Sequence, residues 1–415
     1  MPDLLLLHNI GELVTLEGGP RRGTREMNDL AIQTDAAVLV EEGVIAEVGK
    51  SERLLRSAPN DAVKVNCGGR SVVPGFCDPH THAVFAGDRV EEFEMKLQGA
   101  SYAEILASGG GILRTVRLTR EATRVDLLKQ LMGRLSRMLE HGTTTVEVKT
   151  GYGLDLENER KLLDVIEMAM ERHPIDVVPT LMAAHAVPPE FKDAREFAEH
   201  VAKVIIPELA ERAEFVDVFC EQGVFDVDQS RLVLEAGVQE GLRAKVHADE
   251  LARSGGSLLA GELHAVSADH LLHAGPQERR ALIESDVAAI FLPATALSLR
   301  APYADARAFI DEGALVALAT DLNPNCYTES MAFVMSLACL GMRMSPAEAL
   351  VASTVNAAAA LGRDDRGAIE EEMTADLVIL DAPSYKHLPY RFGANLAWRV
   401  VKMGEIVVDR SERRR

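Results

Sequence analysis

The sequence has few cysteines, and none of them forms a recognisable pattern. Its 415 residues include only Cys67, Cys77, Cys220, Cys326 and Cys339. No pair has the C-x-x-C spacing, and an odd number cannot pair completely in a disulfide framework. Scattered thiols of this kind are typical of a reducing compartment, so we expect a cytoplasmic protein.

Long apolar runs and an excess of basic charge are also absent. No segment approaches the roughly 20 apolar residues that span a bilayer. The run at 4–7 is too short for a signal peptide and has no basic flank. With 64 acidic and 44 basic residues the formal net charge is -20, which argues against nucleic acid or an anionic membrane as a partner. An anionic small-molecule substrate would need locally placed Arg or Lys.

Motifs of two common enzyme classes are missing. No Gly-x-Gly-x-x-Gly or P-loop accompanies the first strand of the middle region, so a nucleotide cofactor has no signature. No Gly-x-Ser-x-Gly is present, so a serine nucleophile has no support.

The middle of the chain alternates between strands and helices. The segment 125–141 carries Leu128, Leu131 and Leu135 at helical spacing and stops at Gly142, a favourable residue after a helix end. About eight apolar strands are expected, at 70–73, 143–148, 177–182, 215–219, 244–246, 265–268, 287–292 and 315–319. This alternation favours the α/β class, as a (β/α)₈ TIM-like barrel, and a doubly wound sheet stays open as the alternative.

Both ends of the chain are rich in strands instead. Segments 36–40 and 44–49 form a plausible hairpin, and 375–381 and 400–408 have the same character. We therefore expect a small β-sandwich domain built from residues 1–65 plus 366–415, and a catalytic barrel over 66–365.

Residues able to do chemistry gather where the predicted strands end. His80 and His82 lie two apart after an apolar strand, so both side chains point the same way. In a barrel the active site lies at these carboxyl ends. The further strand-end residues are Lys149, Tyr152, His185, Cys220, Glu221, His247, Asp249, Glu250, Asp269, His270 and Asp321.

Four of these residues make a suitable set of metal ligands. His80, His82, His247 and Asp321 offer three imidazoles and one carboxylate, which fits one Zn or Fe ion per chain with room for a water. Such an ion lowers the pKa of the water that it binds. Any one of these residues alone is more simply a core or surface residue. The whole set in barrel order is what favours a metal site.

Proton transfer has its own candidates near that set. Glu250, three residues beyond His247, could move a proton to a leaving nitrogen, and His270 could orient or deprotonate the water or polarise a carbonyl. Asp249 reads as a supporting or solvated residue. At the fourth strand this chain has Cys220-Glu221 where two-metal barrel hydrolases often carry a carboxylated Lys, which favours a single ion.

Several blocks of sequence resemble the amidohydrolase superfamily and, more narrowly, its imidazolonepropionase family. They are residues 79–82, 85–89, 97–105, 108–112, 147–154, 247–250 and 320–324, which span nearly the whole predicted barrel. The resemblance implies hydrolysis of the cyclic amide of 4-imidazolone-5-propanoate to N-formimino-L-glutamate by a metal-activated water. It also implies a homodimer.

The resemblance further implies roles for individual residues. Arg89 would bind the propionate of the substrate, a role that suits a guanidinium. The other implied substrate contacts are Tyr102, Tyr152, His185, Glu250, Asn323, Asn325 and Cys326. Glu250, His270 and Asp321 would carry the catalysis.

One departure from the family pattern affects two of these residues. Asn325-Cys326 stands where the family commonly has Gly-Ser or a similar small pair. If the contacts there use backbone groups, the change is tolerable. If a Ser hydroxyl is needed, substrate affinity or identity changes.

Two other functions stay open from the sequence. A cytosine- or guanine-type deaminase would use the same ligands and the same His-x-x-Glu, but a neutral base does not need Arg89. A non-enzymatic scaffold would be expected to have lost ligands that this chain keeps. Zn and Fe share His and carboxylate ligands, so the sequence does not choose between them.

Overall fold

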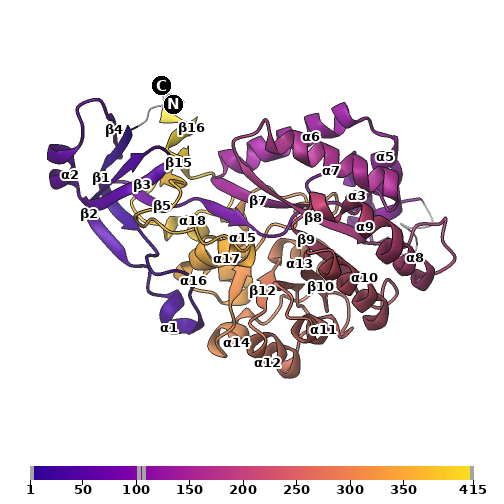
Figure 1. Ribbon diagram of the computed structural model, residues 1–415. Coiled ribbons are helices and arrows are strands. Elements are labelled where there is room, and N and C mark those ends of the chain that lie inside the picture. The colour runs from indigo at the N-terminus through magenta and orange to yellow at the C-terminus, as the bar shows by residue number, and fades with distance from the viewer. Residues whose placement is uncertain (1–3, 101–103, 105–108, 412–415) are drawn as a thin grey trace.

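The fold consists of two sheets with helices around one of them (Figure 1). The structure is a computed structural model, and it describes residues 4–100, 104 and 109–411. One sheet is parallel and comes from the middle of the chain. The other combines strands from both ends of the chain and lies beside the first.

The parallel sheet has eight strands that follow one another in chain order. They are β6 (Phe76–Asp78), β7 (Thr143–Lys149), β8 (Asp176–Ala184), β9 (Phe215–Cys220), β10 (Arg243–Ala248), β11 (Ser267–His270), β12 (Ala288–Phe291) and β13 (Val316–Leu318). Its two edges meet where the Asp78 carboxylate accepts hydrogen bonds from Thr320 N at 3.0 Å and Thr320 Oγ1 at 2.5 Å. A bridge between Thr81 and Leu322 extends this contact. The predicted barrel is confirmed, because a doubly wound sheet would not bring its first and last strands together.

Helices surround the barrel and carry its apolar shell. They are α3 (Val90–Leu97), α5 (Ile112–Glu121), α6 (Arg124–Glu140), α7 (Leu156–Met170), α8 (Ala194–His200), η1 (Val201–Ile205), α9 (Ile206–Leu209), η2 (Ala210–Arg212), α10 (Val227–Gln239), α11 (Gly256–Glu262), α12 (Pro276–Glu284), α13 (Pro293–Leu299), α14 (Ala306–Asp311), α15 (Met331–Met342), α16 (Pro346–Ala352) and α17 (Val355–Ala360). Within the described ranges, no helix combines the length and the hydropathy needed to cross a membrane.

Helix α6 shows why the sequence forms these helices. Thr123 caps its start by accepting a hydrogen bond from Asp126 N at 3.1 Å. Leu131 and Leu135 are fully buried on one face. Gly142 follows the helix with φ +97°, a conformation that glycine adopts without strain, and the chain then enters β7.

The terminal sheet joins the two ends of the chain. Its strands are β1 (Leu4–Val14), β2 (Ile32–Glu41), β3 (Val44–Lys50), β4 (Val63–Asn66), β5 (Ser71–Pro74), β14 (Leu377–Leu380), β15 (Ala397–Lys402) and β16 (Glu405–Asp409), with α1 (Gly23–Met27), α2 (Ser51–Ser57) and α18 (His387–Tyr390) outside the strands. The order is β16-β15-β14-β5-β1-β2-β3, and β4 also pairs with β1. The C-terminal β14 thus pairs antiparallel with the N-terminal β5. The division into two domains remains our proposal, with the barrel beginning after Pro74 and not at residue 66.

Two strands differ from the sequence prediction. Segment 70–73 is not the first barrel strand, because β5 pairs with β1 and β14 and the barrel begins at β6. The chain crosses between the sheets at Gly75, where a Cβ atom would lie 2.3 Å from Thr144 Oγ1. Segment 400–408 is two strands, because Met403 and Gly404 have positive φ and form a tight hairpin turn.

Candidate active site

The four predicted metal ligands lie together at the carboxyl ends of the barrel strands. His80 and His82 follow β6, His247 is in β10, and Asp321 follows β13. Ring nitrogens of the three histidines all lie within 4.8 Å of one another. Asp321 Oδ1 lies 3.6 Å from His80 Nε2 and 3.7 Å from His82 Nε2. All four side chains are almost completely buried.

Carboxylates behind the histidines fix which nitrogen faces the cluster. His80 Nδ1 lies 2.6 Å from Asp269 Oδ2, and His247 Nδ1 lies 3.0 Å from Asp217 Oδ2. A carboxylate accepts a proton donor, so the Nδ1 of His80 carries the hydrogen and its Nε2 keeps its lone pair. The Asp217 carboxylate lies against Nδ1 of His247, which leaves Nε2 of that ring toward the cluster. The Nε2 atoms of His82 and His247 face each other at 3.2 Å.

The donor set fits a metal ion. Burial lowers the pKa of His80 and of His82 well below the usual range, so both rings are neutral, as metal ligands must be. In the part of the chain that the structure describes, His80 Nε2 and Asp321 Oδ1 are buried without a hydrogen-bond partner. Asp321 Oδ2 accepts a hydrogen bond from Thr295 Oγ1 at 2.5 Å, which leaves Oδ1 toward the cluster. Converging lone pairs of this kind are stabilised by a cation.

A ladder of buried charges lies beneath the cluster. Lys149 Nζ is 2.7 Å from Asp217 Oδ2, 2.8 Å from Glu147 Oε2 and 3.8 Å from Asp269 Oδ2. Lys245 Nζ is 3.0 Å from Glu147 Oε1. Burial opposes the charge on Lys149, but Asp217 and Glu147 raise its pKa above the usual value. The two lysines therefore stabilise the carboxylates that orient His80 and His247.

Only part of this ladder is predictable from the strand ends in the sequence. Lys149 and Asp269 stand at strand ends, but Glu147, Asp217 and Lys245 lie inside strands and were missed. A signal for them is present in the sequence. Glu147 and Lys149 are two apart in a strand whose other residues are Thr and Val, and this is the spacing of residues on the same side of a strand.

The proton-transfer candidates line a cavity of about 590 Å³ beside the cluster. Glu250 Oε2 lies 3.8 Å from His270 Nε2. Burial raises the pKa of Glu250 to about 8, and the nearby Asp321 adds to this effect. His270 and Asp321 have φ values of +77° and +51°. Such conformations cost of order 1–3 kcal/mol each, and this cost is characteristic of functional sites.

Two further carboxylates hold the loop that carries Glu250. Asp249 is fully buried and accepts hydrogen bonds from Ser254 N at 2.7 Å, Gly255 N at 2.9 Å and Ser257 N at 3.1 Å. Glu221 accepts one from Leu251 N at 2.8 Å. Asp249 thus supports the loop. Its complete burial excludes the other prediction from the sequence, that it is a solvated residue.

Most of the predicted substrate contacts line the same cavity. They are Arg89, Tyr152, His185, Glu250, Asn323 and Asn325. His185 Nδ1 lies 3.1 Å from Gly151 O, and its ring stacks on His82 with a centroid distance of 4.7 Å. Burial lowers the pKa of His185 to about 3, so the ring is neutral and its Nε2 is an acceptor. Tyr102 lies outside the described residues.

The turn at 323–326 shows how the unusual Asn325-Cys326 pair is accommodated. Asn323 Oδ1 accepts hydrogen bonds from Asn325 N at 2.7 Å and Cys326 N at 3.0 Å. These bonds use backbone groups of both residues and do not depend on their side chains. Cys326 lines a neighbouring, larger cavity and not the one that holds Glu250.

The comparisons with known proteins agree with this geometry. The amidohydrolase family matches residues 154–407. The imidazolonepropionase of Haloarcula marismortui is 50% identical over 397 residues, covering 94% of each chain. That of Symbiobacterium thermophilum is 46% identical over 423 residues, covering 100% of this chain and 99% of its own. The chain belongs to the imidazolonepropionase family of amidohydrolases. Membership makes it a hydrolase that uses a metal ion and a small-molecule substrate.

Solved structures extend the likeness to the fold. An adenosine deaminase from Xanthomonas campestris with bound zinc matches with a TM-score of 0.74 and 18% identity, covering 98% of this chain and 93% of its own. At that identity the likeness concerns the barrel and the terminal sheet, and not the substrate.

Proposed function

We propose that the protein hydrolyses the ring amide of 4-imidazolone-5-propanoate to N-formimino-L-glutamate in histidine degradation. The observation that carries the proposal is the composition of one cavity. His82, His247 and Asp321 of the metal cluster line it together with the acid Glu250 and the guanidinium of Arg89. A ring amide with an anionic tail needs these three kinds of group.

The metal part of the proposal is one ion per chain, Zn or Fe. His80, His82, His247 and Asp321 would hold it, because their ligand atoms converge and the rings of His80 and His82 are neutral. An ion bound there polarises a water or a carbonyl oxygen. The zinc-bound deaminase with the same fold favours Zn as the first ion to test.

Three side chains of the cavity suit recognition of the substrate. Arg89 would pair with the propionate, since a guanidinium binds a carboxylate through two parallel hydrogen bonds. His185 Nε2 would accept a hydrogen bond from a ring N–H, because Nδ1 already donates to Gly151 O. Asn323 would contact the opened product from the turn that follows Asp321.

Glu250 would deliver the proton that completes ring opening. Water adds to the ring carbonyl carbon, and His270 and Asp321 help to remove a proton from this water. The bond from that carbon to the ring nitrogen breaks, and Glu250 protonates the departing nitrogen. The carbonyl carbon becomes a carboxylate, so the product has two carboxylates where the substrate has one.

Arg89 favours this reaction over a deaminase reaction. A neutral nucleobase offers no partner for a guanidinium in the cavity. We further propose a cytoplasmic homodimer with no nucleic-acid or membrane partner. The five free cysteines and the net charge of -20 support the location and the lack of polyanion binding, and the dimer rests on the base rate for soluble enzymes.

A direct assay tests the proposal. The purified protein, loaded with Zn or Fe, is given freshly prepared 4-imidazolone-5-propanoate under anaerobic conditions. We expect loss of the ultraviolet absorbance of the substrate and formation of N-formimino-L-glutamate, identified by mass, with both abolished by a chelator. No turnover by metal-loaded protein, together with release of ammonia from an aminated ring such as cytosine, would overturn it.

A further inference from the structure

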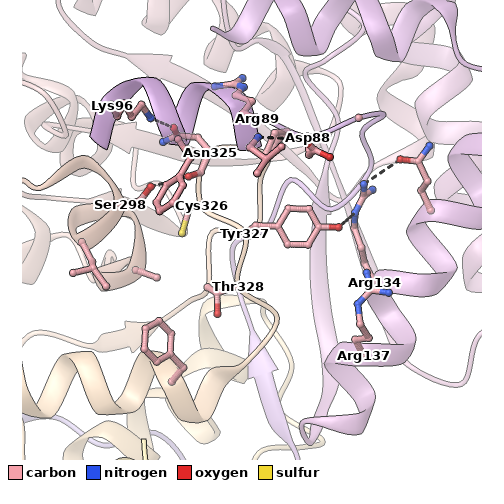
Figure 2. Close-up of a pocket in the computed structure, with 18 of the residues that line it drawn as sticks. Asp88, Arg89, Lys96, Arg134, Arg137, Ser298, Asn325, Cys326, Tyr327 and Thr328 are labelled. Atoms are coloured by element: carbon pink, nitrogen blue, oxygen red, sulfur yellow. Dashed lines mark hydrogen bonds between the residues drawn. The ribbon is translucent and has the colours of Figure 1, made fainter. Parts of the chain in front are cut away.

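A large basic cavity adjoins the catalytic cavity. Its volume is about 1070 Å³, and Arg89 and Asn325 line both spaces. Figure 2 shows Arg89, Lys96 and Asn325 among the residues that surround it. The carboxylates that line it are Asp88 and Asp126, and the cations are Arg89, Lys96, Lys129, Arg134, Arg137 and Arg300. Such a concentration of positive charge stands out in a chain with a net charge of -20.

Most of these cations are exposed or already engaged. Arg137 pairs with Glu329 at 2.8 Å. Arg134 donates to two backbone carbonyls, at 2.8 and 2.9 Å, and stacks on Phe85. Lys129 and Arg300 are exposed at the rim. Arg89 lines both cavities, and Lys96 contacts Asn325, which also lines both, so these two cations lie at the junction with the catalytic cavity.

Helix α3 brings Arg89 and Lys96 to that junction. Arg89 immediately precedes the helix and Lys96 lies seven positions later, which is close to two helical turns, so the two residues lie on the same side of the helix. Val90, Phe93 and Leu97 line the basic cavity from the same face. Lys96 Nζ donates a hydrogen bond to the side-chain oxygen of Asn325. Arg89 Nε donates to Thr115 Oγ1 at 3.1 Å, which leaves its two terminal nitrogens for another partner.

The two residues have no acidic side chain in direct contact with them among the described residues. Within the described ranges, neither Arg89 nor Lys96 forms an ion pair. Lys96 is half-buried, and burial lowers its pKa; Glu92 on the preceding turn raises the pKa, and Arg89 lowers it by a smaller amount. Because both cations line the same cavity, an anion bound between them would relieve their mutual repulsion.

We propose that Arg89 and Lys96 form a two-cation site for the ring-opened dicarboxylate product at the exit from the catalytic cavity. The proposal rests on the proposed function, because ring opening creates the second carboxylate. Arg89 holds the carboxylate that substrate and product share, and Lys96 takes up the new one when the product turns toward the basic cavity. The site thus favours product over substrate by one charge pair and directs release.

Calorimetry with simple carboxylates tests the site without any turnover. Glutarate, a five-carbon dicarboxylate, is compared with butyrate, which has one carboxylate, at the same ionic strength. We expect the protein to bind glutarate at least about tenfold more tightly, because a second charge-assisted bond forms. Raising the salt concentration should weaken glutarate binding more than butyrate binding, since the pair at the junction is only half-buried.

Two matched variants locate the second cation. Lys96→Met should abolish the preference for glutarate and leave butyrate binding unchanged. Lys129→Met, which removes a cation from the rim of the same cavity, should keep the preference. The two-cation site is overturned if the Lys96→Met variant still prefers glutarate over butyrate, or if both variants lose this preference equally. If Lys96→Met does not fold, the salt dependence of binding by the unaltered protein tests the site. Equal dependence of glutarate and butyrate affinity on salt concentration would then overturn the two-cation site.

The outcome is separable from that of the proposed function. A glutarate preference without turnover of 4-imidazolone-5-propanoate contradicts the reaction and removes the reason to call the ligand a product. Normal turnover without a glutarate preference contradicts the two-cation site alone.

Discussion

The proton-transfer role proposed for Glu250 can be tested without disturbing the structure around it. It lies in the catalytic cavity but outside the four proposed ligands, and backbone bonds to Asp249 and Glu221 hold its loop without using its own carboxylate. A change at this position can therefore remove proton transfer while the metal cluster stays intact.

Replacing Glu250 by Gln should lower kcat by about 10²–10⁴-fold, since an amide of the same shape cannot transfer the proton. Metal content should stay at one ion per chain. Steady-state kinetics and elemental analysis measure the two quantities. The control is Glu240→Gln, which alters an exposed carboxyl and should leave both unchanged. Near-normal turnover of the Glu250 variant would remove Glu250 from the mechanism.

Among the elements, strands β7, β9, β10 and β11 carry the ladder of charges that supports the cluster. Each contributes charged side chains from its middle or end to the buried interior of the barrel, where Lys149 contacts three carboxylates. Removing Lys149 leaves the buried Asp217 carboxylate without its lysine partner, which costs more than the ion pair itself contributes.

Lys149→Met should therefore destabilise the protein by about 3–5 kcal/mol. For a domain of this size we expect a fall in Tm on the order of 5–10 °C. Lys203→Met is the matched control, because Lys203 forms an exposed ion pair with Glu199 at 2.9 Å on one helix and should change Tm little. Differential scanning calorimetry of the two variants decides. Equal Tm values would show that the ladder does not stabilise the barrel.

The same strands show how far the sequence could predict the structure. Apolar runs followed by polar residues located seven of the eight barrel strands and all four proposed ligands, because both patterns are local. The run at 70–73 looked like a barrel strand and was not, since only pairing with β14, some 300 residues later, assigns it to the other sheet. Asp217 and Lys245 were missed because their partners Lys149 and Glu147 lie on β7, which is distant in sequence and not adjacent to β9 or β10 in the sheet, and local sequence does not identify such contacts.

At the scale of the whole molecule, metal binding and stability are linked. His247 and Asp321 are far from His80 and His82 in the chain, so the unfolded state lacks the site and an ion stabilises only the folded state. At a free ion concentration 1,000 times Kd the gain is about 4.1 kcal/mol. A chelator should lower Tm by several degrees, and His80→Ala should abolish this effect. An identical Tm with and without chelator would contradict a tightly bound ion.

Acid should destabilise the chelated protein through its buried histidines. Burial lowers the pKa of His185 from 6.5 to about 3, so below pH 6.5 the unfolded chain takes up a proton that the folded chain does not. Stability is then lost as pH falls from 6.5 toward 3, by up to about 1.4 kcal/mol per pH unit for this residue. Urea midpoints at pH 7 and pH 5 measure the loss, which should be smaller in His185→Gln. If the His185→Gln variant loses as much stability between pH 7 and pH 5 as the unaltered protein, the loss comes from other groups.

The terminal sheet has a consequence for synthesis of the protein. Its first five strands leave the ribosome early, but β5 waits for its neighbour β14, which begins only at Leu377. At about 5–20 residues per second the interval is roughly 15–60 s. During that time β5 presents an unpaired edge of the kind that recruits other chains. The terminal sheet is thus the first to be synthesised and the last to be completed. Misassembly between nascent chains is therefore expected to be greatest where several ribosomes translate the same message.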